Sequence, residues 1–234
     1  NDTIPAVGPG ASGANATWNL SAMNNHVEDT LLFTNPNWTQ FGPQFPTANL
    51  AVGFGMNSGN YAYLNNQANG AFIVGQAGDF GFGPMALVMN PVDQLVSFPC
   101  TYNSTFNATS RFSIDIEYTA SPPLDSIRVK HQSVKSSICD GWGNVTTPLG
   151  TFPSLRLKEH IVNIDSIFGH IPFSGWQFIQ ETIDSTAHFA WWADGIGFPL
   201  VEMDSAIDGT GTDEEMSYSL LHCEQVTIRQ HDQR

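Results

Sequence analysis

The residues that could do chemistry in this chain are seven histidines, three cysteines and 22 acidic residues. No His-Glu-x-x-His or His-x-His metal motif occurs, no Gly-x-Ser-x-Gly nucleophile turn, and no glycine loop followed by Lys-Ser/Thr. The nearest approach to an acid–base pair is Asp184 with His188, which strand alternation places on one face. We interpret this pair as part of a polar strand face. The sequence therefore predicts no catalytic residue, no cofactor and a protein that is not an enzyme.

One acidic stretch has the composition of a calcium site. Residues 204–215 are rich in carboxylates and glycine, and oxygen ligands on such a loop suit Ca²⁺. The candidate ligands are Asp204, Asp208, Asp213 and Glu215. The stretch lacks the full EF-hand spacing, so we favour a solvated loop between strands at 198–203 and 216–221 and predict no metal.

The charge balance excludes two classes of partner. The chain has eight basic and 22 acidic residues. The resulting net charge of −14 argues against nucleic acid and anionic lipid as binding partners, because both are bound by basic patches. No run of 18 apolar residues occurs, so the sequence predicts no membrane span. Only 13% of the residues are charged, which favours an exported protein whose surface is built from Asn, Ser, Thr and Gly.

The elements that must position these residues are predicted to be strands. Residues 111–119 alternate strictly, with Phe112, Ile114 and Ile116 on one face. Short apolar runs separated by turn residues fill 29–90, and 176–190 also favours a strand. Glycines in 141–143 and 148–150 predict two turns before a strand at 154–158. We expect an all-β fold, an antiparallel sandwich-like or curled sheet with long loops, in one domain over 1–234 with a soft boundary near 91–104.

Three cysteines fit no zinc or redox motif. Cys100 follows one strand-like run and Cys139 ends another, so we favour a disulfide between these two among the three pairings available. Cys223 would then remain as a small buried apolar residue.

The chain resembles a group of secreted proteins of Bacteroidota that are exported by the type IX secretion system. Loose turn and packing motifs across nearly the whole chain carry this resemblance. They are Pro5–Gly10 with Gly13–Ser21, Phe45–Ala51, Phe98–Tyr102, Asp140–Gly143 with Thr147–Phe152, Leu155–Lys158 and Trp191–Leu200. The resemblance implies an extracellular or outer cell surface location more than an activity.

Six Asp-(Ser/Thr)-x sequences match the O-glycosylation motif of Bacteroidota. The predicted acceptors are Thr3, Thr30, Ser126, Ser166, Ser185 and Ser205. The alternative interpretation is that Asp-Ser and Asp-Thr are simply common at turns and strand ends.

Aromatic residues are the remaining candidates for binding. Rings beside turn residues could stack on sugars or form an interface, and the candidates are Trp38, Trp142, Trp176 and Tyr61. Adjacent Trp191 and Trp192 must point to opposite faces of a strand.

We expect a non-enzymatic structural or adhesive protein of the cell surface, which assembles with itself into a filament or surface layer. Its partners would be copies of itself or surface glycans. The alternative is a carbohydrate-binding module, which would show a row of exposed rings. A third hypothesis, a hydrolase with a cryptic site, requires a cleft with convergent carboxylates or a histidine pair.

Overall fold

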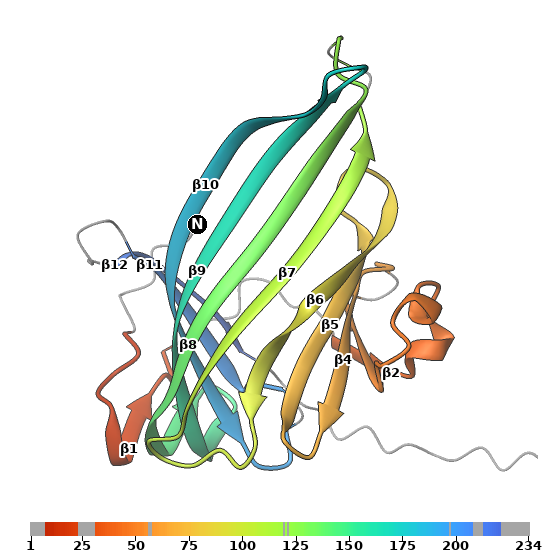
Figure 1. The fold of residues 1–234 in the computed structure, drawn as a ribbon. Helices are drawn as coiled ribbons and strands as arrows, with labels where there is room; N and C mark the ends of the chain where they lie inside the picture. The colour runs from red at the N-terminus through yellow and green to blue at the C-terminus, as the bar shows by residue number, and fades with distance from the viewer. Residues whose placement is uncertain are drawn as a thin grey trace, which may run out of the picture.

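The computed structural model of the chain consists almost entirely of β-strands (Figure 1). It describes residues 8–22, 31–55, 58–118, 120, 122–196, 198–207 and 213–220, and for 206–207 and 213–220 it describes the backbone alone. Two short 3-10 turns, η1 (Pro36–Trp38) and η2 (Gly42–Gln44), accompany the strands. The strands are β1 (Gly13–Asn19), β2 (Leu31–Thr34), β3 (Leu50–Phe54), β4 (Tyr61–Gln67), β5 (Gly70–Asp79), β6 (Pro84–Ser97), β7 (Thr105–Glu117), β8 (Ser126–Thr147), β9 (Gly150–Ile171), β10 (Gly175–Ala193), β11 (Val201–Ile207) and β12 (Asp213–Leu220).

The predicted all-β fold class is confirmed, and the strands form two sheets. A seven-stranded sheet has the order β1-β8-β9-β10-β11-β12, with β7 also paired to β8, and a five-stranded sheet has the order β2-β3-β4-β5-β6. The long strands β7 to β10 curve together as one curled sheet (Figure 1). Residues 98–104 connect β6 of the five-stranded sheet to β7 of the seven-stranded sheet, and the soft boundary near 91–104 stays a prediction. Within the described residues, no helix has the length and apolar character needed to cross a membrane.

The two faces of the seven-stranded sheet have different neighbours. Cys139, Leu157 and Ala190 are partners across β8, β9 and β10, and they pack against Ala71 and Val96 of the five-stranded sheet. We call this side of the sheet the inner face and the opposite side the outer face. Because side chains alternate along each strand, the register assigns every residue of β7 to β10 to one of them.

Several strand predictions are confirmed by these assignments. Phe112 and Ile114 of β7 are half-buried on the inner face, whereas Ser113 and Asp115 are exposed on the outer face. Residues 176–190 lie within β10. At the end of β10, Trp191 is fully buried in an outer-face core and Trp192 packs into the inner-face core, so the two rings do point to opposite faces.

The lower half of the sheet, at the β1 end in Figure 1, has a core on its outer face as well. At its centre lies Arg156, only 1% exposed. Its Nε and Nη2 donate to the two carboxylate oxygens of Asp140 at 2.8 and 2.9 Å, and its Nη1 donates to the Gly10 carbonyl at 3.1 Å. The guanidinium lies 5.2 Å from the ring centroid of Trp18 and 5.6 Å from that of Trp191. This arrangement fastens the N-terminal segment to the sheet.

The turn predicted at residues 141–143 is wrong, because β8 continues through it to Thr147 and only Pro148-Leu149 form the turn to β9. The glycines serve close packing instead. A Cβ on Gly143 would lie 1.9 Å from the Ala16 carbonyl oxygen, and one on Gly141 would lie 2.8 Å from the Trp18 ring. Strand β1 runs parallel to β8 at this place, and it can approach closely only because these side chains are missing.

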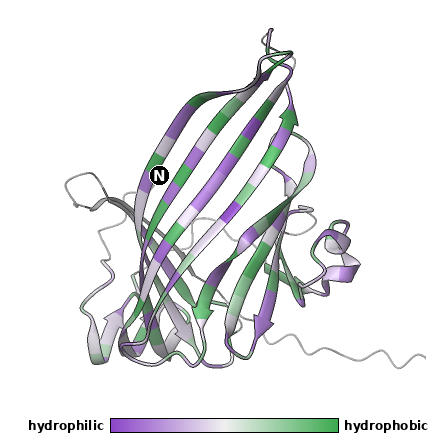
Figure 2. Cartoon of the chain, in the orientation of Figure 1, coloured by the Kyte–Doolittle hydropathy of each residue, from purple (hydrophilic) through white to green (hydrophobic). Residues whose placement is uncertain are grey.

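The upper half of the sheet, toward the β9–β10 turn at the top of Figure 1, has neither face fully covered. All eight residues from Ile161 to Phe168 of the central strand β9 are half-buried, whereas a strand with one covered face would alternate between buried and exposed. Figure 2 shows apolar and polar residues following one another along these strands. At the turn itself, the Phe173 side chain is fully exposed.

Candidate functional site

A row of polar side chains crosses the inner face in the lower half of the sheet. Ser137, Glu159, His188 and Asp204 are direct partners on β8, β9, β10 and β11. The Ser137 hydroxyl donates to Glu159 Oε1 at 2.5 Å, and His188 Nδ1 lies 2.7 Å from Asp204 Oδ1. Glu159 Oε2 lies 3.9 Å from His188 Nε2, so the four residues form one continuous network.

The network continues to the second sheet through a buried lysine. Lys135 is 5% exposed, and its Nζ lies 3.1 Å from Asp93 Oδ1 on β6 and 3.9 Å from Glu159 Oε1. A buried ammonium group is tolerated only with such partners, because its desolvation is otherwise too costly. Lys135 therefore ties β6 to β8 and β9 electrostatically.

His188 is the one group of the network with a clearly displaced titration. Burial alone would lower its pKa, but the hydrogen bond to Asp204 and the charges of Asp204, Glu159 and Glu202 outweigh burial and raise the pKa above its ordinary value. The Glu202 carboxylate lies 3.7 Å from His188 Nε2. These carboxylates therefore stabilise the charged imidazolium relative to the neutral ring.

This network has the groups of an acid–base site but not the space of one. The cavity beside Glu159, His188 and Glu202 measures about 30 Å³, which holds about one water molecule. The Ser137 hydroxyl donates to the Glu159 carboxylate and not to His188, so this network does not have the serine–histidine arrangement of a catalytic triad. The pair considered in the sequence also separates, because Asp184 accepts a hydrogen bond from Asn163 while His188 pairs with Asp204. The arrangement fits a structural role.

The calcium candidates fall in different surroundings. The Asp204 carboxylate is engaged with His188. Asp213 and Glu215 lie on β12, of which the backbone is described, and Asp208 lies outside the described residues. No group of three or more His, Cys, Asp or Glu side chains that could hold a metal ion occurs within the part of the chain that the structure describes.

A second cluster of functional groups lies on the outer face, and it is cationic. The structure describes six Lys and Arg residues, of which Lys135 and Arg156 are buried. The register places the remaining four on the outer face of three adjacent strands, opposite Gln132, Asp115, Ser113 and Ile138. They are Arg111 on β7, Arg128 and Lys130 on β8, and Lys158 on β9.

Aromatic rings lie under two of these cations. The Arg128 guanidinium lies 4.1 Å from the ring centroid of Trp176, and the Lys130 ammonium lies 4.8 Å from that of Phe168. Phe168 in turn meets the 61%-exposed Phe178 edge-on, with 5.7 Å between ring centroids. Such contacts hold the cations in place while the rings remain partly accessible.

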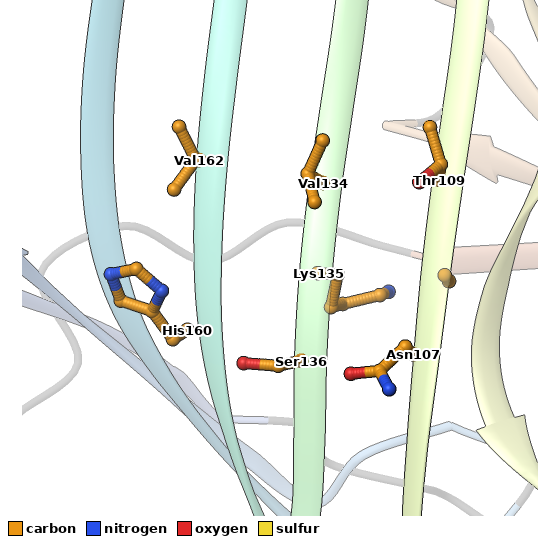
Figure 3. Close-up of a pocket in the computed structure, with 8 residues that line it drawn as sticks. Asn107, Thr109, Val134, Lys135, Ser136, His160 and Val162 are labelled. Carbon is orange, nitrogen blue, oxygen red and sulfur yellow. The ribbon is translucent and has the colours of Figure 1, made fainter.

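A shallow hollow of about 260 Å³ lies on the same strands, nearer their middle. Figure 3 shows Thr109, Val134 and Val162 in one row across it and Asn107, Ser136 and His160 in the next. The His160 Nε2 is 2.9 Å from the Ser185 hydroxyl of β10. The hollow thus offers hydroxyl, amide and imidazole groups over an aliphatic floor.

The structure brings Cys100 and Cys139 together, although both are free thiols. The thiol hydrogen bond from Cys139 lowers the pKa of Cys100, and the same contact together with burial raises the pKa of Cys139. The loop that carries Cys100 is fastened beside Cys139 by backbone bonds from Asn103 and to Ser104. The disulfide stays a prediction, and the proximity that it needs is present.

The predicted stacking residues are scattered. Trp38 on η1 is 81% exposed and Trp142 is 40% exposed, whereas Tyr61 packs against the core of the five-stranded sheet. Trp176 alone lies beside other groups suited to binding, because it forms part of the cationic outer face.

The predicted glycosylation sites also differ in access. Ser126, Ser166 and Ser185 are half-buried on the outer face, and Thr3 and Thr30 lie outside the described residues. Ser205 is only 1% exposed, which argues against a glycan there in the folded protein.

Comparisons of the chain with models of protein families, with curated proteins and with solved structures find no match. The resemblance to exported Bacteroidota proteins therefore depends on the sequence motifs alone.

Sequence reasoning missed both charged clusters, although signals for them exist. Glu159 occupies a position whose neighbours two residues away, Leu157 and Ile161, are apolar residues of the inner face. A charge in an apolar register predicts a buried pair. The first 110 residues contain no Lys or Arg, so the cations are concentrated in the later strands. Aligning β7, β8 and β9 then places four of them on one face.

Proposed function

We propose that this protein is a non-enzymatic structural or adhesive component of the bacterial cell surface, which assembles with copies of itself. The observation that carries the proposal is the open upper half of the long-stranded sheet. A single layer of sheet leaves the apolar residues on both of its faces partly exposed to water, so their burial adds little stability. Stable folds normally cover such a layer with a second one.

The inner face of this region has the composition of a contact surface. Two apolar rows cross it, Ile114–Val129–Ile167 and Ile116–Ile127, and all five side chains are half-buried. Ile179 beside them is 49% exposed. A second copy presenting the same rows would cover both surfaces in one contact, as symmetric dimers do.

The absence of working space in the Glu159–His188 network supports the non-enzymatic half of the proposal. The net charge of −14 and the Asp-(Ser/Thr) motifs support an exported protein. Both remain arguments from chemistry and composition, and the proposed location follows from the resemblance to type IX secretion substrates.

The test is light scattering coupled to size-exclusion chromatography, with electron microscopy of the same samples. We expect the full chain to form oligomers or filaments at micromolar concentration. Ile179→Ser should weaken assembly about tenfold or more, since an isoleucine that is half exposed becomes buried in the contact. Trp38→Ser is the matched control, because it removes a larger exposed apolar side chain from η1.

A monodisperse monomer at high concentration would contradict the proposal. Equal losses of assembly in Ile179→Ser and Trp38→Ser would mean that the inner face is not the surface through which the copies assemble.

A further inference from the structure

We propose that the outer face of β7, β8 and β9 binds a linear anionic polysaccharide, of the type with one carboxylate per sugar. The site is a track of four cations that follows β8, and it goes beyond self-assembly because it assigns a ligand to the opposite face of the sheet. The argument starts from where the positive charge of this acidic chain is placed.

The cations lie on three adjacent strands along the length of β8. Arg128 and Lys130 belong to β8, Arg111 is the partner of Gln132, and Lys158 is the partner of Ile138. Projected on β8, the track therefore runs from position 128 to position 138, about 33 Å at the strand's rise per residue. The hollow of Figure 3 lies within this track, between Arg111 and Lys158.

Most of these charges are available to a ligand. Asp115 holds Arg128 with two hydrogen bonds, at 2.6 and 2.7 Å, and Arg111 Nε donates to the neutral Gln132. No carboxylate of the described residues forms an ion pair with Arg111, Lys130 or Lys158. The chain has a net charge of −14, yet these three exposed cations lie together on one face of the sheet.

The neutral groups along the track suit a sugar. Trp176 and Phe168 present partly exposed rings beside Arg128 and Lys130. Asn107, Thr109 and Ser136 line the hollow with groups that can both donate and accept, as sugar hydroxyls require. Rings and cations thus lie together at the Arg128 end of the strip, and the hydroxyl and amide groups lie between Arg111 and Lys158.

The groups between the cations decide between classes of polyanion. Between Arg111 and Lys158 the strip presents hydroxyl, amide and aliphatic side chains. A polysaccharide carries free hydroxyls beside its carboxylates and can use these groups, whereas the sugars within a DNA strand have no free hydroxyl.

The experiment is a calorimetric titration of the full chain with polygalacturonate, at low and at physiological salt. Neutral dextran and single-stranded DNA of similar length are the comparison ligands. We expect polygalacturonate to bind, to bind more weakly at the higher salt, and to bind better than both comparison ligands. Binding that is equal for dextran or stronger for DNA would overturn the proposal.

A matched pair of variants tests the site itself. Lys130→Gln and Gln67→Glu each lower the net charge by one, but Gln67 is exposed on β4 of the other sheet. We expect Lys130→Gln to weaken binding about tenfold, as the loss of one charge-assisted hydrogen bond does, and Gln67→Glu to change it less than twofold. Equal effects would overturn the site. Light scattering on the same samples separates this outcome from a failure of self-assembly, because a protein that assembles without binding polygalacturonate contradicts only the present inference.

Discussion

The buried ion pair of Arg156 with Asp140 permits the sharpest prediction, because the chain contains an exposed pair of the same geometry. In both pairs an arginine donates two hydrogen bonds to one aspartate, at 2.8 and 2.9 Å for Arg156 and at 2.6 and 2.7 Å for Arg128 with Asp115. The side chains of the first pair are 2% and 11% exposed, and those of the second are 30% and 51% exposed. Burial is therefore the main difference.

Asp140→Asn removes the counter-charge of Arg156 with almost no change of shape. Arg156 would then be a buried cation without its carboxylate partner, so we expect the free energy of unfolding to fall by about 3–5 kcal/mol. Asp115→Asn should cost at most about 1 kcal/mol, because water replaces the lost partner. The measurement is urea denaturation followed by both fluorescence and circular dichroism.

In thermal terms, the Asp140→Asn protein should melt about 10 °C below the wild type, and Asp115→Asn within a few degrees of it. Similar losses in the two variants would refute the reasoning, since geometry rather than desolvation would then determine the energy. A loss below about 1 kcal/mol for Asp140→Asn would refute it as well, because it would mean that water or a rearranged carboxylate reaches Arg156.

Three further predictions concern other parts of the sheet. Because the pKa of His188 is raised in the folded protein, protonated His188 stabilises the fold. This stabilisation is complete below about pH 6.5, the ordinary pKa of histidine, and is lost as the pH rises through the folded-state pKa. Unfolding midpoints measured from pH 5.5 to 9 should therefore fall in the wild type and stay flatter in His188→Gln. Gly143→Ala should displace β1, since the new Cβ would lie 1.9 Å from the Ala16 carbonyl oxygen, and faster hydrogen exchange confined at first to residues 13–19 would reveal this, whereas unchanged protection would contradict it. Mild oxidation should link Cys100 to Cys139, which mass spectrometry of the peptides detects, and should stabilise the fold by about 4 kcal/mol through loop closure; an oxidised protein without this link would contradict the pairing.

The sequence was informative where one local rule decides the structure. Strict alternation in 111–119 became β7, and the adjacent tryptophans of β10 took opposite faces, because period two alone fixes both outcomes. The Pro-Leu connection at 148–149 likewise became a turn. Fold class and most strands could therefore be predicted.

The sequence was misleading where a distant partner decides the structure. Gly141 and Gly143 read locally as turn residues, but they make room for β1, which lies more than 120 positions earlier. The apolar register around Glu159 indicates burial, but its partner Lys135, and Asp93 of the other sheet beside Lys135, are identified only when the strands are placed side by side. No short stretch of sequence contains both members of such a contact, so local patterns do not predict it.

The parallel pairing of β1 with β8 has a consequence for the order in which the protein folds. Gly13 is the partner of Gly141, so β1 cannot pair until β8, more than 100 residues later in the sequence, has been made. The hairpins β7–β8, β8–β9 and β9–β10 join neighbours in sequence and cost little chain entropy, whereas β1 must close a very long loop. Its docking then supplies the carbonyl groups of the N-terminal segment to Arg156 and the Trp18 ring to the outer-face core. Strand β1 is thus expected to dock after these hairpins, and a chain interrupted before β8 leaves β1 without its partner strand.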